Sequence, residues 1–297
     1  MGYGRSGSTF LGTALGGHPA VFAAGELSNI VKARKVHKEY CSCGVRSSDC
    51  AFWNTVAQHW NDAVGDCAEL DYPAMMNRFE RARHGLLHRP PLHQRGRAWE
   101  RYANYTRSLF SAIARTSSAE TVVDSSKKPA RALALSQIED IDLRVIHLVR
   151  DVRGVALSMQ KSWRPDPKKG IAVPLAPLRP SQVTAHWSFV NAQANRVRRR
   201  LGARAMLMRY EDLIAAPEAA LQQISAFTDM DFVPVVERLS RGGGIEPGHQ
   251  IAGNRLRMQS SIQLKPDTRW RRELSPLRRY WIRSLAAWLA FYYSCRP

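Results

Sequence analysis

The first residues of the chain carry a group of side chains that suits anion binding. Residues 4–9 read GRSGST and run directly into a helix-like stretch at 8–17. A helix N-terminus carries about half a positive charge and several free N–H groups, so it can hold a phosphate-like anion. Arg5 adds a cation, and Gly7 permits a tight turn. The hydroxyl groups of Ser8 and Thr9 stand at the first helical positions.

This loop differs from the common triphosphate-binding loop in two respects. It lacks the lysine of the pattern G-x-x-x-x-G-K-[ST], and the candidate magnesium ligand Asp124 is followed by Ser-Ser-Lys. The loop is therefore predicted to bind phosphate without a triphosphate and its metal. Only residues 1–4 precede Arg5 of this loop, where a buried strand normally stands. We expect a truncated first strand, and favour a start codon placed too late, because a central strand contributes much apolar surface and many hydrogen bonds.

A second candidate anion site lies at residues 145–162, which read VIHLVRDVRGVALSMQKS. Arg150 stands where a strand is expected to end, and Ser158 follows two turns into the next helix. A guanidinium and a helix-borne hydroxyl at this spacing can converge on one phosphate. The alternative is that Arg150 pairs with a carboxylate at the strand end.

Short stretches rich in Val and Ile alternate with helix-like segments along the chain. This order predicts an α/β fold with a parallel sheet and crossover helices. The expected strands are 21–24, 121–124, 144–149 and 204–209. The further expected helices are 54–64, 97–116, 129–138, 151–163, 182–200, 218–228 and 276–293. A Pro-rich loop at 164–180 is a candidate flap over a site.

Charge is the unusual feature of the composition. The 297 residues include 44 basic and 25 acidic side chains, and only nine of the basic residues are lysines. Arginine binds phosphate and carboxylate in a two-pronged fork, so anionic ligands are expected, although a GC-rich genome would also enrich arginine. The longest apolar stretch, 285–293, is too short to span a bilayer. We expect a cytoplasmic protein, with peripheral membrane association left open.

Four motifs occur in a specific order: GRSGSTF, VVDSSKKPARAL, HLVRDVRGVALS and RYEDL. Together they resemble the sulfotransferases that use 3′-phosphoadenosine 5′-phosphosulfate (PAPS), over a span from Tyr3 to about Trp270. The RSGST form and the following Gly25-Glu26 resemble the carbohydrate and tyrosylprotein enzymes more than the phenol and steroid enzymes. The resemblance implies a nucleotide-kinase-like, three-layer P-loop fold with a central parallel sheet. It also implies one domain over 1–297, in which 54–116 and 164–180 shape the acceptor site.

The resemblance assigns a set of residues to the donor. The opening loop would surround the 5′-phosphosulfate, and the second site would hold the 3′-phosphate. Two aromatic residues would lie against adenine, unless they serve ordinary core packing. A late basic loop, GNRLR, would close over the 3′-phosphate, with Arg257 the first choice and Arg255 the second. The residues implied around the 5′-phosphosulfate are Arg5, Ser6, Gly7, Ser8 and Thr9. Those implied for the 3′-phosphate are Arg150 and Ser158, and those against adenine are Phe10 and Tyr210.

Sulfuryl transfer resembles phosphoryl transfer, so it needs positioning and cations and requires no metal. Arg5 would stabilise the leaving oxygen, and Lys127 is placed by analogy beside the sulfuryl group. Glu26 ends a predicted strand and matches the general base of the tyrosylprotein relatives. The alternative interpretation of Glu26 is a surface or helix-capping residue without a catalytic role. The alternative interpretation of Lys127 is a solvated loop lysine. His18 is a second possible base, although its place at a helix end favours a structural role.

Three cysteines, Cys41, Cys43 and Cys50, invite comparison with a zinc site. Structural zinc requires four ligands in short paired spacings, and neither His37 nor Cys67 is well placed as the fourth. We therefore expect no metal. A redox disulfide and a structural loop near the acceptor cleft are the other interpretations.

Two other functions compete with sulfuryl transfer from PAPS to a hydroxyl or amine of a small molecule or glycan. A small-molecule kinase with a degenerate phosphate loop would need a magnesium site. A basic nucleic-acid-binding protein would show a basic stripe with interleaved aromatics or a known binding module, and the sequence shows neither. No nucleic-acid partner is therefore expected, and the product of the favoured reaction is 3′-phosphoadenosine 5′-phosphate.

Overall fold

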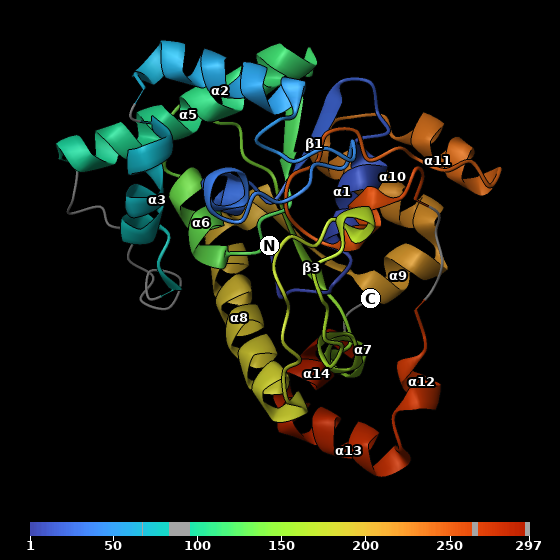
Figure 1. Cartoon of the computed structure of the whole chain (residues 1–297). Coiled ribbons are helices and arrows are strands. Elements are labelled where there is room, and N and C mark those ends of the chain that lie inside the picture. Colours follow the sequence, from blue (N-terminus) through green and yellow to red (C-terminus); the bar gives the residue numbers. More distant parts are fainter. Residues whose placement is uncertain (67, 83–95, 263–266, 295–297) are drawn as a thin grey trace.

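The strands of the protein form two parallel pairs at its centre. The computed structural model describes residues 1–66, 68–82, 96–262 and 267–294. In this part of the chain β1 (Val21–Gly25) pairs with β2 (Thr121–Asp124), and β3 (Val145–Val149) pairs with β4 (Ala205–Arg209). Helices lie around the strands (Figure 1). The predicted α/β class with parallel strands is confirmed.

The first residues of the chain connect the two strand pairs. The amino group of Met1 donates a hydrogen bond to the Ile146 carbonyl at 2.6 Å, and the Met1 carbonyl accepts one from the Leu148 N–H at 3.0 Å. On the other side, the Gly2 N–H donates to the Lys127 carbonyl at 3.2 Å. Gly2 has a φ of 138°, and a Cβ there would lie 2.4 Å from the Leu148 carbonyl oxygen. The backbone just before the anion-binding loop is therefore held between β3 and the segment after β2.

The sequence predicted four of the helices that follow the strands, at 129–138, 151–163, 182–200 and 218–228. The first two end earlier than predicted, at Leu135 and Met159, and the short helices at 210–215, 233–240 and 270–273 were not predicted. Asp151 caps α7 because its Oδ1 accepts a hydrogen bond from the Arg153 N–H at 2.8 Å. The flanking helices are α1 (Ser8–Leu15), α6 (Pro129–Leu135), α7 (Val152–Met159), α8 (Pro180–Leu201), α9 (Tyr210–Ala215), α10 (Pro217–Thr228), α11 (Val233–Ser240) and α12 (Trp270–Glu273). The short helical turns are η1 (Leu27–Asn29), η2 (Lys32–Val36), η4 (Pro167–Lys169), η5 (Gly202–Arg204) and η6 (Arg255–Met258).

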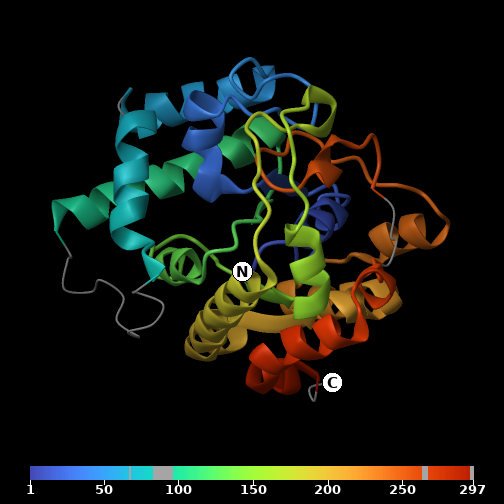
Figure 2. The same cartoon turned by 60° about the horizontal axis from the view of Figure 1, so that its bottom comes forward.

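The C-terminal helix predicted at 276–293 is divided into α13 (Pro276–Leu285) and α14 (Ala287–Ser294). The break falls at Ala286, whose φ of −114° departs from helical geometry. Ala286 is fully buried, and it packs with Ile282 and Leu289 in the core cluster that contains Trp187. Figure 2 brings these two helices to the front.

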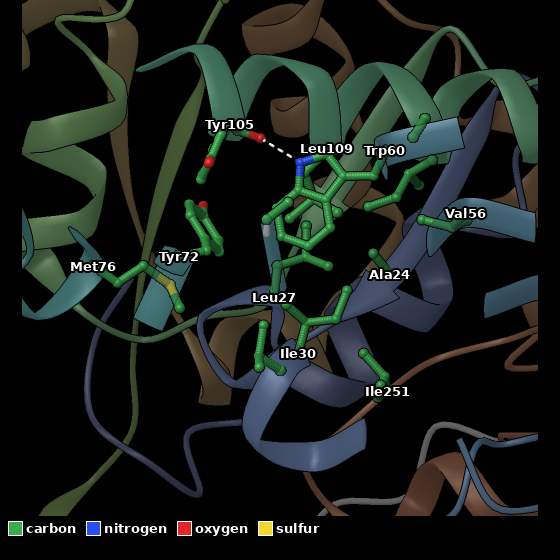
Figure 3. Packing of buried hydrophobic residues seen from close by; sticks show 14 of the residues in the cluster. Ala24, Leu27, Ile30, Val56, Trp60, Tyr72, Met76, Tyr105, Leu109 and Ile251 are labelled. Carbon is green, nitrogen blue, oxygen red and sulfur yellow. Dashed lines mark hydrogen bonds between the residues drawn. The ribbon is translucent and has the colours of Figure 1, made fainter. Parts of the chain in front are cut away.

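Three helices between β1 and β2 build a large aromatic core over one side of the molecule. They are α2 (Ala51–Val64), α3 (Ala68–Phe79) and α5 (Arg97–Ser117), and α3, which contains Pro73, was not predicted. Figure 3 shows Trp60 and Tyr72 packing toward Leu27, the first residue of η1 after β1. The Trp60 indole N–H donates to the Tyr105 carbonyl at 2.9 Å, so the ring is both buried and hydrogen bonded.

One buried carboxylate fixes the ends of β1 and β2. Asp124 Oδ1 accepts hydrogen bonds from the N–H groups of Leu27, at 3.2 Å, and Ser126, at 2.8 Å. Its Oδ2 accepts one from Arg131 Nε at 2.8 Å, and Arg131 also pairs with Glu80 beyond α3. Burial opposes ionisation of Asp124, but the charge of Arg131 and the hydrogen bonds from Ser126 lower its pKa below the ordinary value.

A buried histidine on β3 predicts acid sensitivity of the fold. His147 Nε2 donates to Asn191 Oδ1 at 3.0 Å, and burial lowers the pKa of His147 to about 3. Between about pH 6.5 and pH 3 the unfolded chain binds a proton that the folded chain does not, so stability falls as pH drops. The loss is at most about 1.4 kcal/mol per pH unit.

The variant His147→Gln keeps a donor for Asn191 but has no titrating group. We expect its unfolding free energy, measured in urea at pH 7, 6 and 5, to fall less steeply than that of the wild type. His186→Gln, on an exposed position of α8, should leave the slope unchanged. If the unfolding free energy of His147→Gln falls with pH as steeply as that of the wild type, His147 is not the source of the acid sensitivity.

Candidate active site

The loop that precedes α1 has the backbone geometry of an anion site. Arg5 and Gly7 both have positive φ, at 64° and 93°, and Gly7 provides no side-chain cap for α1. A Cβ on Gly7 would lie 2.5 Å from the Tyr210 ring, so glycine is required both by φ and by space. The Ser6 hydroxyl is buried and has no hydrogen-bond partner among the described residues. The first N–H groups of α1 and this hydroxyl are thus left for a ligand.

Two adjoining pockets meet at this loop. The larger, of about 760 Å³, contains Arg150, Ser158 and Tyr210. The smaller, of about 320 Å³, contains Glu26 and Lys127. The two pockets share seven lining residues, so they adjoin at the loop. The shared residues are Arg5, Gly7, Phe10, Trp163, Asn254, Arg255 and Leu256.

Arg150 is held in a fixed position on the floor of the larger pocket. Its guanidinium donates to the Arg5 carbonyl at 3.2 Å and to the Asp267 carbonyl at 3.1 Å. It also pairs with the Asp267 carboxylate at 3.2 Å and lies 4.4 Å from the centre of the Tyr210 ring. The carboxylate partner foreseen as the alternative therefore exists, and Ser158 lines the same pocket as the arginine.

Positive charge dominates the larger pocket. Its lining includes five cationic side chains and a single carboxylate, that of Asp267. Burial and the charges of Arg5 and Arg269 lower the pKa of Arg255, which stacks 3.8 Å from the centre of the Trp163 ring. Cations that repel one another at close range are stabilised by an anion between them. The five cations are Arg5, Arg150, Lys161, Arg255 and Arg269.

The late basic loop offers two arginines for the 3′-phosphate, Arg257 and Arg255. Arg255, which the sequence ranked second, is the one that lines the same pocket as Arg150. Arg257 lies outside that lining, and only 2% of its surface is exposed. Its guanidinium donates to the carbonyl of Gly253 at 2.9 Å and to those of Tyr40 and Gly170 at 3.2 Å each. It holds three loops together, and Arg255 faces the Arg150 pocket instead.

The two predicted adenine contacts differ in their surroundings. Phe10 is 6% exposed and packs in the core cluster with Leu148 and Met208, although it also borders both pockets. Tyr210 lies between the Arg150 guanidinium and Gly7 at the edge of the larger pocket. Tyr210 therefore lines the larger pocket, whereas Phe10 belongs mainly to the core.

Glu26 and Lys127 form an ion pair in the smaller pocket. Lys127 Nζ donates to Glu26 Oε1, and Asn29 Nδ2 donates to Glu26 Oε2 at 3.0 Å. Both charged side chains are about one-fifth exposed, at 18% for Glu26 and 21% for Lys127. Glu26 stands at the start of η1 without a capping hydrogen bond from its side chain. The carboxylate lines the pocket with one partner on each oxygen, Lys127 on Oε1 and Asn29 on Oε2.

The wall opposite this pair comes from two distant segments. One is the predicted flap, which contributes Ile171, Val173 and Leu175. Figure 2 shows its short helix, in yellow-green, beside η6 of the late basic loop, in orange-red, and η4 and η6 are in contact. Within that late loop the Asn254 N–H donates to Thr9 Oγ1 at 3.2 Å. The wall is thereby attached to the start of α1.

Sequence reasoning missed several residues of the site. Asn254 lies within the basic loop that was read only for its arginines, and Asp267 and Arg269 follow it without a local motif. Glu39 lines the smaller pocket from a segment that gave no prediction. His18, the second candidate base, lines neither pocket: its Nδ1 accepts from the Ala20 N–H at 3.1 Å, which is a structural role.

Comparison with known proteins defines the class. The sequence model of the sulfotransferase family matches residues 1–234. The structure resembles the sulfotransferase domain of the Synechococcus PCC 7002 olefin synthase, with 18% identity, a TM-score of 0.52, and coverage of 100% of this chain and 93% of that one. The sulfotransferase domain from the curacin biosynthetic pathway matches with 16% identity and a TM-score of 0.48, over 96% and 95% of the two chains. A search of curated protein sequences gives no match.

The chain belongs to the sulfotransferase family, and its fold is that of a sulfotransferase domain. The family predicted from the four sequence motifs is thereby confirmed. Among the described residues, the helices are all too short or too polar to cross a membrane.

Proposed function

We propose that this protein transfers a sulfuryl group from PAPS to a hydroxyl or amine of a small molecule or glycan. The observation that carries the proposal is the larger pocket, where five cations face a single carboxylate beside the Glu26–Lys127 pair. PAPS carries two anionic ends, a 3′-phosphate and a 5′-phosphosulfate. A pocket with this charge suits such a ligand, and the adjoining smaller pocket provides room for the acceptor.

The residues present fit the two ends of this donor. The uncapped start of α1 and the partnerless Ser6 hydroxyl would receive the 5′ end, together with Gly7, Ser8 and Thr9. Arg150, Ser158 and Arg255 would receive the 3′-phosphate at the other side of the pocket. Tyr210 would supply the aromatic surface for adenine.

The side chains of the smaller pocket suit the chemistry of the transfer. The bound donor supplies an activated sulfuryl group attached to a phosphate that can leave. Glu26 accepts the proton of the acceptor hydroxyl, which is the task of a general base. Lys127 and Arg5 neutralise the negative charge that develops during transfer. No protein nucleophile is needed for this division of roles.

The acceptor would lie against the flap. Ile171, Val173 and Leu175 make part of the pocket wall apolar, while Glu26, Asn29 and Glu39 supply polar groups on the other side. A small molecule or sugar with both an apolar and a hydroxyl-bearing part suits this lining. We further propose that 1–297 acts as one domain, because both pockets take residues from the first and the last third of the chain.

Nucleotide binding tests the proposal directly. The wild type should bind 3′-phosphoadenosine 5′-phosphate far more tightly than AMP in isothermal titration calorimetry. Arg150→Ala should lose about 1.5–3 kcal/mol of binding free energy, or at least about tenfold in affinity, because a charge-assisted contact is removed.

The matched control is Arg153→Ala, three residues further along, where the guanidinium pairs with Asp151 outside the larger pocket. Its affinity should equal that of the wild type. Equal affinity of the wild type for the two nucleotides would overturn the donor assignment. Turnover of ATP with Mg²⁺ would favour the kinase alternative.

A further inference from the structure

Four potential metal ligands meet outside the two pockets. They are Cys41, Cys43, Cys50 and His249, and their ligand atoms all lie within 4.8 Å of one another. His249 Nδ1 is 3.4 Å from Cys50 Sγ and 3.7 Å from Cys41 Sγ. The Sγ atoms of Cys43 and Cys50 are 3.7 Å apart. Three of the four atoms come from residues 41–50, and the fourth comes from His249, 199 residues after Cys50.

Three of the six separations between these atoms match the edges of a zinc tetrahedron. With metal–sulfur bonds of about 2.3 Å and a metal–nitrogen bond of about 2.0–2.1 Å, two sulfurs stand about 3.8 Å apart, and sulfur and nitrogen about 3.5 Å. A disulfide would instead bring two sulfurs to about 2.05 Å, and these three cysteines are free thiols. We propose that Cys41, Cys43, Cys50 and His249 bind one structural Zn²⁺ ion.

The surroundings of the cluster hold each ligand in place. Cys41 and Cys43 lie in a tight turn closed by the Cys41 N–H to Val45 carbonyl bond of 2.8 Å, and Gly44 turns with a φ of 94°. Cys50 is the residue before the first turn of α2. The three thiols therefore come from one turn and one helix start, separated by six residues.

His249 is fixed by aromatic neighbours from α2. The Trp53 indole N–H donates to the His249 carbonyl at 2.8 Å. The Phe52 ring stacks on the imidazole with centroids 4.9 Å apart and an interplanar angle of 5°. Such outer contacts hold a metal-binding imidazole in one orientation. The two buried thiols, of Cys41 and Cys50, are covered by the same layer.

The sequence alone did not reveal this set. The candidates for a fourth ligand were His37, which is not a member of the cluster, and Cys67, which lies outside the described residues. His249 follows Cys50 by 199 residues, and no spacing rule connects them. The expectation of no metal rested on the missing fourth ligand, and the fold supplies it.

The proposed ion would connect the cysteine turn to the wall of the active site. Ser42 Oγ donates to the Gly248 carbonyl and accepts from the Gln250 N–H, each at 2.6 Å. At Ile251, two residues after His249, the backbone carbonyl accepts a hydrogen bond from the Glu26 N–H at 2.9 Å. Four protein ligands leave no open position, so the ion has a structural task. The inference does not depend on the proposed donor or acceptor.

Metal analysis of the full-length, reduced protein tests the site without any assay of activity. Purified wild type should contain about one zinc per chain by mass spectrometry of the metal. After removal of zinc by a chelator, the protein should bind one Co²⁺ and show the visible absorption of tetrahedral thiolate-bound cobalt. Chelation should also lower the melting temperature, and added Zn²⁺ should restore it.

Paired variants separate ligation from folding. His249→Gln should lose the zinc and the cobalt absorption, whereas His249→Cys, which keeps a ligand atom, should retain both. Cys43→Ser removes a ligand at an exposed position, and His186→Gln serves as the control on α8. The proposal is overturned if the reduced wild type binds neither metal, or if His249→Gln and Cys43→Ser keep full stoichiometry.

Discussion

Replacing Glu26 by glutamine should lower the rate of sulfuryl transfer by about 10²–10⁴-fold, the usual value of general-base catalysis. Glutamine preserves the shape of the side chain and can still accept from Asn29, but it cannot take a proton. Affinity for 3′-phosphoadenosine 5′-phosphate should stay within about twofold, because Glu26 lines the smaller pocket and is absent from the lining of the larger one. The measurement is single-turnover transfer with saturating PAPS and an acceptor found in a screen of hydroxyl and amine compounds.

Glu39 provides the matched control for this variant. Glu39 is the other carboxylate that lines the smaller pocket. Burial raises the pKa of Glu39, and its Oε2 lies 3.6 Å from Nη2 of the buried Arg257. Glu39→Gln should change the transfer rate far less than Glu26→Gln does. If Glu39→Gln slows transfer strongly and Glu26→Gln does not, the general base is Glu39. Loss of nucleotide binding in Glu26→Gln would instead make that residue structural.

Lys127→Ala should slow transfer by about 10²–10³-fold, the usual loss when one group that stabilises transition-state charge is removed. It should also weaken binding of PAPS more than that of 3′-phosphoadenosine 5′-phosphate, because only PAPS carries the sulfuryl group. Single-turnover rates and calorimetric titration of both nucleotides measure the two effects separately.

Lys128→Ala removes an adjacent lysine that is exposed to solvent, and it should behave as the wild type. An equal loss of affinity for both nucleotides in Lys127→Ala would place that lysine on the nucleotide instead of the sulfuryl group. If Lys127→Ala transfers the sulfuryl group at nearly the wild-type rate, Lys127 is a solvated loop lysine without a role in transfer.

Local patterns were sufficient to predict most elements of the fold. The strand at 121–124 was located to the residue, and those at 21–24, 144–149 and 204–209 to within one residue, because apolar β-branched stretches ended by charged or glycine residues mark buried strands. The C-terminal break at Ala286 was missed because it lies inside the continuous apolar run 285–293, which contains no glycine or proline to mark a helix end. Its cause is tertiary, since the break places Ala286 in the Trp187 core cluster.

The candidate site shows the same limit. Arg5, Arg150, Glu26 and Lys127 stand in local motifs, and the fold brings them to two adjoining pockets. The choice between Arg255 and Arg257 could not be made from sequence, because it depends on which arginine meets the carbonyls of Tyr40 and Gly170. His249 gave no signal, because its partners come from the other end of the chain.

The hydrogen bonds of Asp124 have a consequence for how the acceptor preference of this protein can change during evolution. One oxygen, Oδ1, holds the backbone of Leu27 and Ser126, the residues next to Glu26 and Lys127. The two proposed reacting side chains are thus anchored by a single buried group, whereas the apolar wall opposite them belongs to the separate flap. Under the proposed function, substitutions at 171–175 should alter which acceptor is taken while leaving Glu26 and Lys127 in place. Among descendants of a common ancestor, new acceptor preferences should arise first in the flap, while Asp124 and its neighbours remain unchanged.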